Sequence, residues 1–378
     1  METRFDNANF FGADARLHFG NVRINDGIIE RVKTLDPLPH TGAKFVLPGC
    51  IDTHTHAMIG SEYFDEDERA SAAARQALAK AGTTSFLFAT MAMGEEQLKY
   101  RCRAAAKAVK KRPTGESRCL GVYLEGPFIS NEKRGAHNPD LLHLPDEAML
   151  TRLDEAAEGC IRAVCMAPEL EGATELAKKL KYKKVVSFAH SAADYDKAKE
   201  AFDSGFSNLT HAFNCMQPMM HRAPGPIAAA ADTDFVTAEL IDDARHVQPP
   251  MIRALFKLMG PERIILISDS IEACGMPDGL FEASDGMIIR LEKGRATVNG
   301  TNTLAGSVVP LFEGVRTIAA AGIPLERAIA AATVNPARKY GLDNKIGSIT
   351  EGLRADIIAC TDKLEIEKVY IDGEEITN

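Results

Sequence analysis

The chain has 378 residues, 45% hydrophobic and 26% charged, which is the composition of an ordinary globular protein long enough to bury a full core. Its 53 acidic and 44 basic residues give a net charge of −9, which argues against non-specific binding to nucleic acid or to an anionic membrane surface. No apolar run approaches the roughly 18 residues of a membrane span, and the charged start of the sequence is not typical of a signal peptide.

Short apolar runs alternate with amphipathic stretches along most of the chain. The runs are rich in β-branched or aromatic residues, as buried parallel strands are, and they cover residues 45–53, 84–89, 120–125, 161–166, 185–190, 207–211, 235–240 and 264–269. Helices are predicted between most of the runs and after the last, at residues 67–81, 95–111, 146–158, 174–180, 193–203, 250–259 and 308–321. The link between the sixth and seventh runs, rich in Met, Pro and Gly, does not follow this pattern.

Eight strand–helix units in series predict an α/β fold, a (β/α)8 TIM-type barrel, in preference to the alternative of a doubly wound open sheet. The chain ends, residues 1–46 and 341–378, instead carry short β-like pieces separated by turns. We expect both ends to form one small β-sandwich domain beside a catalytic barrel of residues 47–340. A hairpin over residues 287–298 is predicted as an insertion after the eighth strand.

Acidic and imidazole side chains end five of the eight runs. Catalytic residues of such a barrel lie at the C-terminal ends of its strands, so these side chains are expected to meet at one mouth. His54 and His56 share a face, because residues i and i+2 do on a strand, although this pair alone is equally compatible with two surface histidines in a loop. The candidates, in chain order, are His54, His56, Glu125, His190, His211 and Asp269.

Converging imidazoles and a carboxylate are suitable ligands for a divalent ion such as zinc, with one position left open for water. The ion lowers the pKa of that water, so that hydroxide is available near neutral pH. A nearby carboxylate can take the proton of the water and later deliver one to the leaving group. Asp269, at the end of the last strand, is the candidate for this role, and its alternative is to cap the segment that follows.

The chain resembles the amidohydrolase superfamily and, within it, the family of N-acetylglucosamine-6-phosphate deacetylases. The resemblance to the superfamily rests on LPGCIDTHTH (47–56), ATVNPA (332–337) and GSITEGLRAD (347–356). The resemblance to the deacetylase family rests on LEGPF (124–128), GAHNP (135–139), APE (167–169), THAFNCM (210–216) and LAGS (304–307). It runs from about residue 15 to the C-terminus.

This resemblance implies hydrolysis of N-acetylglucosamine 6-phosphate to glucosamine 6-phosphate and acetate, with one or two divalent ions bound, zinc first and Fe, Mn, Co or Ni as alternatives. The implied ligands are Glu125, His190 and His211 for the main ion and His54 and His56 for a second, with Asp269 as the acid/base. The resemblance also implies a homodimer in which Arg222 reaches the neighbouring subunit's site and binds the sugar phosphate together with Asn214. Other implied substrate contacts are Ala136, Cys215, His246, Leu304, Ala305 and Gly306, and His137, in the loop after the third run, is a further candidate.

The chain departs from the family pattern at three places. The loop 57–65 is not glycine-rich, Tyr123 replaces a common histidine, and Cys215 replaces the more usual alanine. No predicted ligand is lost, but a related substrate such as N-acetylgalactosamine 6-phosphate remains open. A cyclic amidase would be expected to carry a bridging lysine at the end of the fourth run, and residues 161–169 contain none. A non-enzymatic scaffold, the remaining alternative, would be expected to have lost ligands.

Eight cysteines are scattered along the chain without a Cys-x-x-Cys pair. This usage is typical of a reducing compartment, so we expect the protein to be cytoplasmic and its cysteines to pack as small apolar residues. It gives no support to a structural zinc site built of thiolates.

Overall fold

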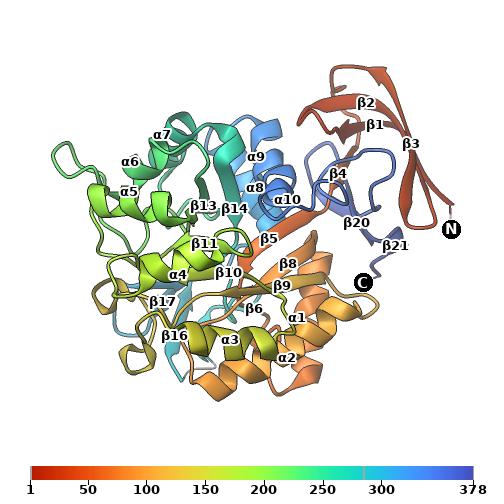
Figure 1. Ribbon diagram of the computed structural model, residues 1–378. Helices are drawn as coiled ribbons and strands as arrows, with labels where there is room; N and C mark the ends of the chain where they lie inside the picture. The colour runs from red at the N-terminus through yellow and green to blue at the C-terminus, as the bar shows by residue number, and fades with distance from the viewer. Residues whose placement is uncertain (1, 284–285, 378) are drawn as a thin grey trace.

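The computed structural model describes residues 2–283 and 286–377. Figure 1 shows a barrel surrounded by helices and, beside it, a separate sheet that contains both chain ends. The eight parallel strands of the barrel sheet, hydrogen-bonded in chain order, confirm the predicted (β/α)8 barrel. They are β5 (Cys50–Thr55), β8 (Thr83–Ala89), β9 (Arg118–Leu124), β10 (Ile161–Met166), β11 (Val185–Phe188), β12 (Phe206–Leu209), β13 (Thr237–Ile241) and β14 (Ile264–Ile267).

The first strand and the segment after the last are joined by backbone hydrogen bonds. Asp269 N donates to His54 O at 2.9 Å, and His56 N donates to Ser270 O at 3.0 Å. These bonds lie at the C-terminal ends of the strands, where the predicted site residues are. The backbone of the candidate site is therefore held on both sides by the closure of the barrel.

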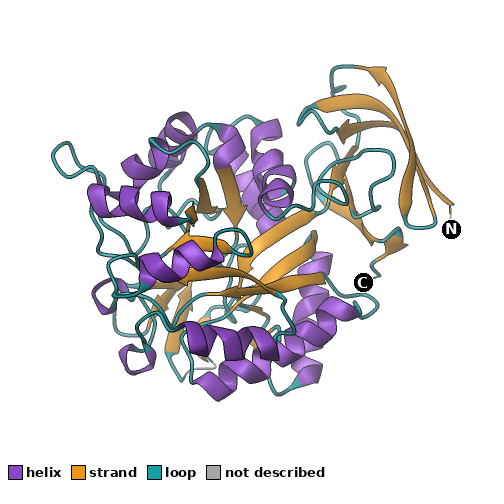
Figure 2. Cartoon of the chain, in the orientation of Figure 1, coloured by secondary structure: helices purple, strands orange, loops and turns teal. Residues whose placement is uncertain are grey.

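The helices, purple in Figure 2, lie outside the barrel strands. The predicted helices correspond to α1 (Glu68–Lys80), α2 (Glu95–Lys110), α3 (Glu147–Ala156), α4 (Ala173–Leu180), α5 (Tyr195–Ser204), α7 (Pro249–Met259) and α8 (Leu311–Ala320). Three more were not predicted: α6 (Gly225–Ala231), α9 (Leu325–Ala332) and α10 (Val334–Lys339). The sixth connection is thus helical after all, but α6 is too short to show a clear period. Among the described residues, the helices include none of the length and hydropathy that crossing a bilayer requires.

The predicted strand at 45–53 is two strands, which corrects the sequence interpretation. β4 (Phe45–Pro48) belongs to the terminal sheet and pairs with its strands on both sides, whereas β5 starts the barrel. Gly49 separates the two. A Cβ atom at this position would lie 2.1 Å from Thr84 Oγ1, so the chain passes β8 too closely for a side chain. An apolar run alone does not reveal such a change of sheet.

The chain ends form one seven-stranded sheet in the order β21-β20-β19-β4-β1-β2-β3. The remaining strands of this sheet are β1 (Glu2–Phe11), β2 (Leu17–Asn25), β3 (Ile28–Asp36), β19 (Ile357–Cys360), β20 (Ile366–Ile371) and β21 (Glu374–Glu375). Phe5 of β1 and Tyr370 of β20 have ring centroids only 5.8 Å apart although two strands separate theirs. The sheet therefore folds over its own core, as the predicted β-sandwich domain requires.

The predicted hairpin after the eighth strand is confirmed as β16 (Ile288–Glu292) and β17 (Arg295–Val298). Its partner strands, which the sequence does not reveal, are β15 (Gly279–Glu282) and β18 (Leu304–Gly306). β18 brings the predicted substrate contacts at 304–306 to the barrel mouth. A separate two-stranded piece, β6 (Ala57–Met58) and β7 (Ser61–Glu62), follows the first barrel strand.

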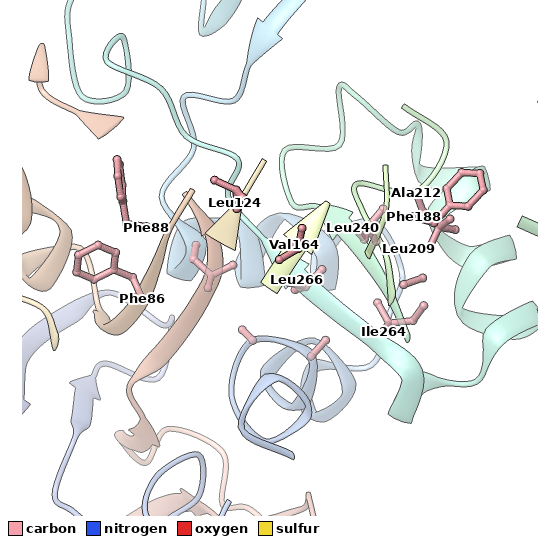
Figure 3. Packing of buried hydrophobic residues seen from close by; sticks show 14 of the residues in the cluster. Phe86, Phe88, Leu124, Val164, Phe188, Leu209, Ala212, Leu240, Ile264 and Leu266 are labelled. Carbon is pink, nitrogen blue, oxygen red and sulfur yellow. The ribbon is translucent and has the colours of Figure 1, made fainter. Parts of the chain in front are cut away.

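Alternate residues of the barrel strands face the helices or the barrel interior. The outward residues, some of them shown in Figure 3, form the main apolar core; they include Phe86, Phe88, Leu124, Val164, Phe188, Leu209, Leu240 and Leu266. Several inward residues are polar and buried, namely Tyr123, Ser187, Asn208 and Glu239. The space beneath the barrel mouth is therefore filled by a hydrogen-bonded network.

Gly314 of α8 allows a close approach that predicts an unusual mutational effect. A Cβ atom there would lie 1.8 Å from Asp242 Oδ2. The Asp242 carboxyl is fully buried without a hydrogen-bond partner among the described residues, and burial raises its pKa well above the usual value. Gly314→Ala should thus cost about 1–3 kcal/mol through overpacking, although alanine normally favours a helix by about 1 kcal/mol.

Urea unfolding of Gly314→Ala, Asp242→Ala and the double variant measures this effect. In the Asp242→Ala background the added methyl has room, so the alanine should become neutral or stabilising, which gives a coupling energy between the two sites. Equal costs of Gly314→Ala in both backgrounds would contradict this account.

Candidate metal centre and active site

The six predicted strand-end residues converge at the C-terminal mouth of the barrel. His54 lies in β5, Glu125 follows β9 directly, and the others come two residues after their strands or, for His56, one. The four histidines and Glu125 are each at most 5% exposed. His190, His211 and Asp269 have φ values of 44°, 29° and 50°. Such left-handed backbone is costly for these residues, and it is typical of functional sites, where the surrounding structure holds it in place.

Glu125 lies between two pairs of histidines. Its Oε2 atom is 3.4 Å from the Nε2 atoms of both His54 and His56. Its Oε1 atom is 3.2 Å from His190 Nε2 and 3.3 Å from His211 Nε2. Each carboxylate oxygen therefore faces one pair of imidazoles, so Glu125 could contribute a ligand atom together with either pair.

Hydrogen bonds on the far side of the rings fix which nitrogen faces the site. His56 Nδ1 lies 3.1 Å from Ala89 O, and His190 Nδ1 lies 2.9 Å from Lys133 O. A backbone carbonyl only accepts, so each Nδ1 carries a proton and the Nε2 lone pair of the neutral ring points toward Glu125. This is the tautomer that a metal ligand requires.

The donor atoms fit a divalent cation. His190 Nε2 and His211 Nε2 lie 3.1 Å apart, close to the roughly 3.3 Å between two ligands of a tetrahedral zinc with Zn–N bonds of about 2.0–2.1 Å. His54 Nε2 is buried without a hydrogen-bond partner among the described residues. An anionic carboxylate amid imidazole lone pairs is a cation site by its chemistry.

Asp269 faces this cluster from the last strand end. Its Oδ1 atom is 3.2 Å from His56 Nε2 and 3.5 Å from His54 Nε2, and its side chain is 14% exposed. The Asp269 carboxylate therefore lies at the surface of the cluster, where it can accept a proton from a molecule in the site.

His137 has the opposite orientation to the ligand histidines. Its ring lies close enough to Glu125 and His190 for the three side chains to be considered as ligands of one ion. However, Ala92 N donates to its Nδ1 atom at 3.2 Å, so the proton of the neutral ring is on Nε2, 3.8 Å from Glu125 Oε2. Burial and the neighbouring His190 lower the pKa of His137 to about 3, which keeps the ring neutral. His137 is thus a hydrogen-bond donor to the site and lacks a lone pair for a metal.

A cavity of about 330 Å³ opens above the cluster. The predicted site residues that line it are His56, Glu125, Ala136, His137, His190, His211, Asn214, Cys215, His246, Asp269, Leu304, Ala305 and Gly306. His54 lies beneath, fully buried, and Arg222 is exposed beside a different hollow. The structure brings together every predicted residue except Arg222, and the individual roles stay predictions.

Two of the cavity residues are held by local contacts. Asn214 Nδ2 donates to His211 O at 3.1 Å. His246 Nδ1 lies 2.7 Å from Asp243 Oδ2, a partner that sequence reasoning missed. Burial lowers the pKa of His246, but this contact outweighs it and raises the pKa. Both side chains are therefore rigid polar groups suited to hold a polar ligand.

The residues that depart from the family pattern lie at different places relative to the cavity. Tyr123 and Phe64 are buried, and the loop after His56 contributes no residue beyond it to the cavity wall. Cys215 lines the cavity beside Gly135, where a Cβ atom would lie 2.9 Å from its Sγ atom. The loop 57–65 therefore lies outside the cavity wall, whereas Cys215 is part of it.

A second hollow adjoins the site and is strongly basic. It has a volume of about 580 Å³ and shares Leu304 with the cavity. Its charged lining residues are Arg245, Arg290, Glu292, Lys293 and Arg295. In an acidic chain, this local excess of cations favours an anionic ligand at this end of the barrel.

The comparison with known proteins agrees with this chemistry. The sequence profile of the amidohydrolase family matches residues 45–376. N-acetylgalactosamine-6-phosphate deacetylase of Escherichia coli O157:H7 is 32% identical over 359 residues, which cover 93% of each chain. N-acetylglucosamine-6-phosphate deacetylase of Bacillus subtilis is 32% identical over 358 residues, 92% of this chain and 90% of that protein. A mutant N-acetyl-D-glucosamine-6-phosphate deacetylase from Mycobacterium smegmatis, solved with N-acetyl-D-glucosamine-6-phosphate, superposes with a TM-score of 0.90 and 31% identity over 100% of this chain and 99% of that one.

Proposed function

Because this chain belongs to the amidohydrolase family, we propose that it hydrolyses the N-acetyl group of N-acetylglucosamine 6-phosphate to give glucosamine 6-phosphate and acetate. The observation that carries the proposal is Glu125 between two histidine pairs, with Asp269 beside them at the floor of the cavity. The similarity to deacetylases of amino sugar phosphates supports the substrate class. The cavity, lined by histidines, Asn214 and backbone of β18, suits a small polar sugar.

Residues of this chain are placed to hold a metal ion, to transfer the proton and to stabilise the negative charge on the amide oxygen. The histidines and Glu125 would hold a divalent ion, which would polarise the amide carbonyl and lower the pKa of a water molecule. Asp269 takes one proton from the attacking water and delivers it to the amide nitrogen as the C–N bond breaks, so that acetate and a free amine leave. His137 Nε2–H donates a hydrogen bond to the amide oxygen as it gains negative charge. The buried histidines keep bulk water away from the cleaved bond.

We propose zinc as the ion, in one or two positions per chain. Neutral imidazole nitrogen and carboxylate oxygen suit Zn, and also Fe, Mn, Co or Ni, so cellular availability contributes to the choice. All eight cysteines are free thiols. We propose the cytoplasm as the location, since thiols stay reduced there.

The test of the function is amine release by the purified, zinc-loaded protein. The substrates are N-acetylglucosamine 6-phosphate, its galactosamine epimer and unphosphorylated N-acetylglucosamine. Fastest turnover of the first supports the proposal. Fastest turnover of the galactosamine compound would favour the second candidate, an N-acetylgalactosamine-6-phosphate deacetylase. This candidate is tested because the Escherichia coli relative and the Bacillus subtilis relative are equally identical to this chain, at 32%. No turnover of any of them with zinc bound would overturn the proposal.

We propose that the protein acts as a homodimer in which Arg222 of one chain contacts the phosphate in the other. Arg222 is exposed and does not line the cavity of its own chain. The same loop also exposes Met219 (49%) and Met220 (55%). Exposed apolar side chains around a charged one are typical of an interface.

Removing the Arg222 charge is expected to weaken binding of the phosphorylated substrate. A hydrogen bond to a charged group contributes about 1.5–3 kcal/mol, so Arg222→Gln should raise KM about 10- to 150-fold, with a smaller effect on kcat. Arg245→Gln, in the basic hollow of the same chain, is the matched control. If Arg245→Gln raises KM and Arg222→Gln does not, the phosphate is held within one chain.

A further inference from the structure

Glu239 is a buried acid to which the proposed reaction gives no role. It lies in the middle of β13 with 0% of its surface exposed, inside the barrel and beneath the histidine cluster. A carboxylate in such a place is costly unless donors surround it. Its neighbours along the strand, Ala238 and Leu240, belong to the apolar core on the other side of the strand.

Three donors satisfy the Glu239 carboxylate. Tyr123 Oη donates to Oε2 at 3.0 Å, and Asn208 Nδ2 donates to Oε1 at 2.8 Å. His54 Nδ1 lies 3.3 Å from Oε2. Asn208 is itself fixed, because Thr237 Oγ1 donates to its Oδ1 atom at 2.6 Å. The amide therefore cannot turn over without losing that bond.

The contact with His54 determines which ring nitrogen faces the ion site. An ionised carboxylate only accepts hydrogen bonds, so His54 Nδ1 carries the proton and Nε2 presents a lone pair toward Glu125 Oε2 at 3.4 Å. His56 and His190 achieve the same orientation with backbone carbonyls. Of these three histidines, His54 is therefore the one whose orientation depends on another side chain.

We propose that Glu239 is a positioning residue that holds His54 ready for a metal ion, and that it thereby sets whether the His54–His56 position is filled in addition to the His190–His211 position. This inference rests on the proposed function only in that the cluster binds metal. It concerns the number of ions and does not depend on which sugar is hydrolysed.

The substitution Glu239→Gln keeps the shape and changes the hydrogen bonding. If the glutamine NH2 group faces Asn208 Nδ2, two donors oppose each other. If it faces His54, Nδ1 has to accept, the ring proton moves to Nε2, and that nitrogen can no longer bind an ion. The fixed Asn208 amide disfavours the first arrangement. The second is therefore expected, and it acts against metal at the His54–His56 position.

The experiment compares metal content in wild type, Glu239→Gln and the control Tyr123→Phe. The control removes another hydrogen bond to the same carboxylate but keeps the carboxylate itself. Full-length proteins are dialysed against buffered zinc, and bound zinc is counted by mass spectrometry; titration with Co²⁺, followed by its visible absorption, gives the affinity of each position.

We expect two ions in wild type and in Tyr123→Phe, and one in Glu239→Gln, with affinity for the second ion about 10- to 100-fold lower. The thermal unfolding midpoints of the two variants show how far each substitution destabilises the fold, separately from its effect on metal binding. Two ions in Glu239→Gln, one ion in wild type, or equal metal loss in both variants would overturn the inference. A protein that shows the expected metal pattern but does not hydrolyse amino sugar phosphates would overturn the proposed function and leave this inference standing.

Discussion

Glu125→Gln is expected to lose its bound metal and, with it, hydrolysis. Each carboxylate oxygen of Glu125 faces its own histidine pair, with N–O distances of 3.2–3.4 Å. Glutamine has a single acceptor oxygen, and its NH2 group would point a donor at nitrogen atoms that need a cation. Residues that only orient ligands change metal affinity or activity by about 10- to 100-fold, so loss of the shared ligand should exceed that range.

Zinc content and amine release measure this effect. Glu169→Gln is the matched control, because Glu169 lies at the same edge of the barrel but bonds Ser191 Oγ (2.6 Å) and Ala192 N (2.7 Å) in place of the cluster. The control should keep its zinc. Retention of two ions by Glu125→Gln would mean that the carboxylate does not bridge them.

Asp269→Asn is expected to stop proton transfer while the metal remains. The Asp269 carboxylate faces the cavity, and its Oδ1 atom lies 3.2 Å from His56 Nε2. Asparagine has nearly the same shape but cannot take a proton from water, and general base and acid catalysis contribute about 10²- to 10⁴-fold. We therefore expect kcat to fall by about that factor with little change in KM.

The zinc count of Asp269→Asn separates the two possible reasons for a slow enzyme. An unchanged count with a lowered kcat assigns proton transfer to Asp269. A parallel loss of zinc would instead make Asp269 a metal ligand, and an unchanged kcat would remove it from the reaction.

Much of the site could be predicted because its residues sit at regular places. The i, i+2 spacing of His54 and His56 and the strand ends at Glu125 and His190 follow from the barrel alone. In the sequence, Glu239 is one acid within an apolar run, and nothing local shows that it lies beneath His54. The proton position on His137 depends on Ala92, which comes from a different connection of the barrel.

Other features depend on contacts that a linear pattern does not contain. The break of the first apolar run at Gly49 follows from the position of Thr84 in the neighbouring strand. The role proposed for Arg222 requires a second chain, whose position cannot be worked out from the order of residues in one sequence. The short helix α6 is formed by only seven residues, too few to establish a helical period.

The terminal sheet affects the order in which the protein can be assembled during synthesis. β4 pairs with β1 from the start of the chain and with β19 from its end, and the entire barrel is translated between these two partners. Until the last strands leave the ribosome, β4 therefore has an unpaired edge, which is a place where strands of other chains can add. Such pairing across the whole length also slows folding, because the chain closes a very long loop. We expect the nascent protein to depend on protection of this edge until its final residues arrive.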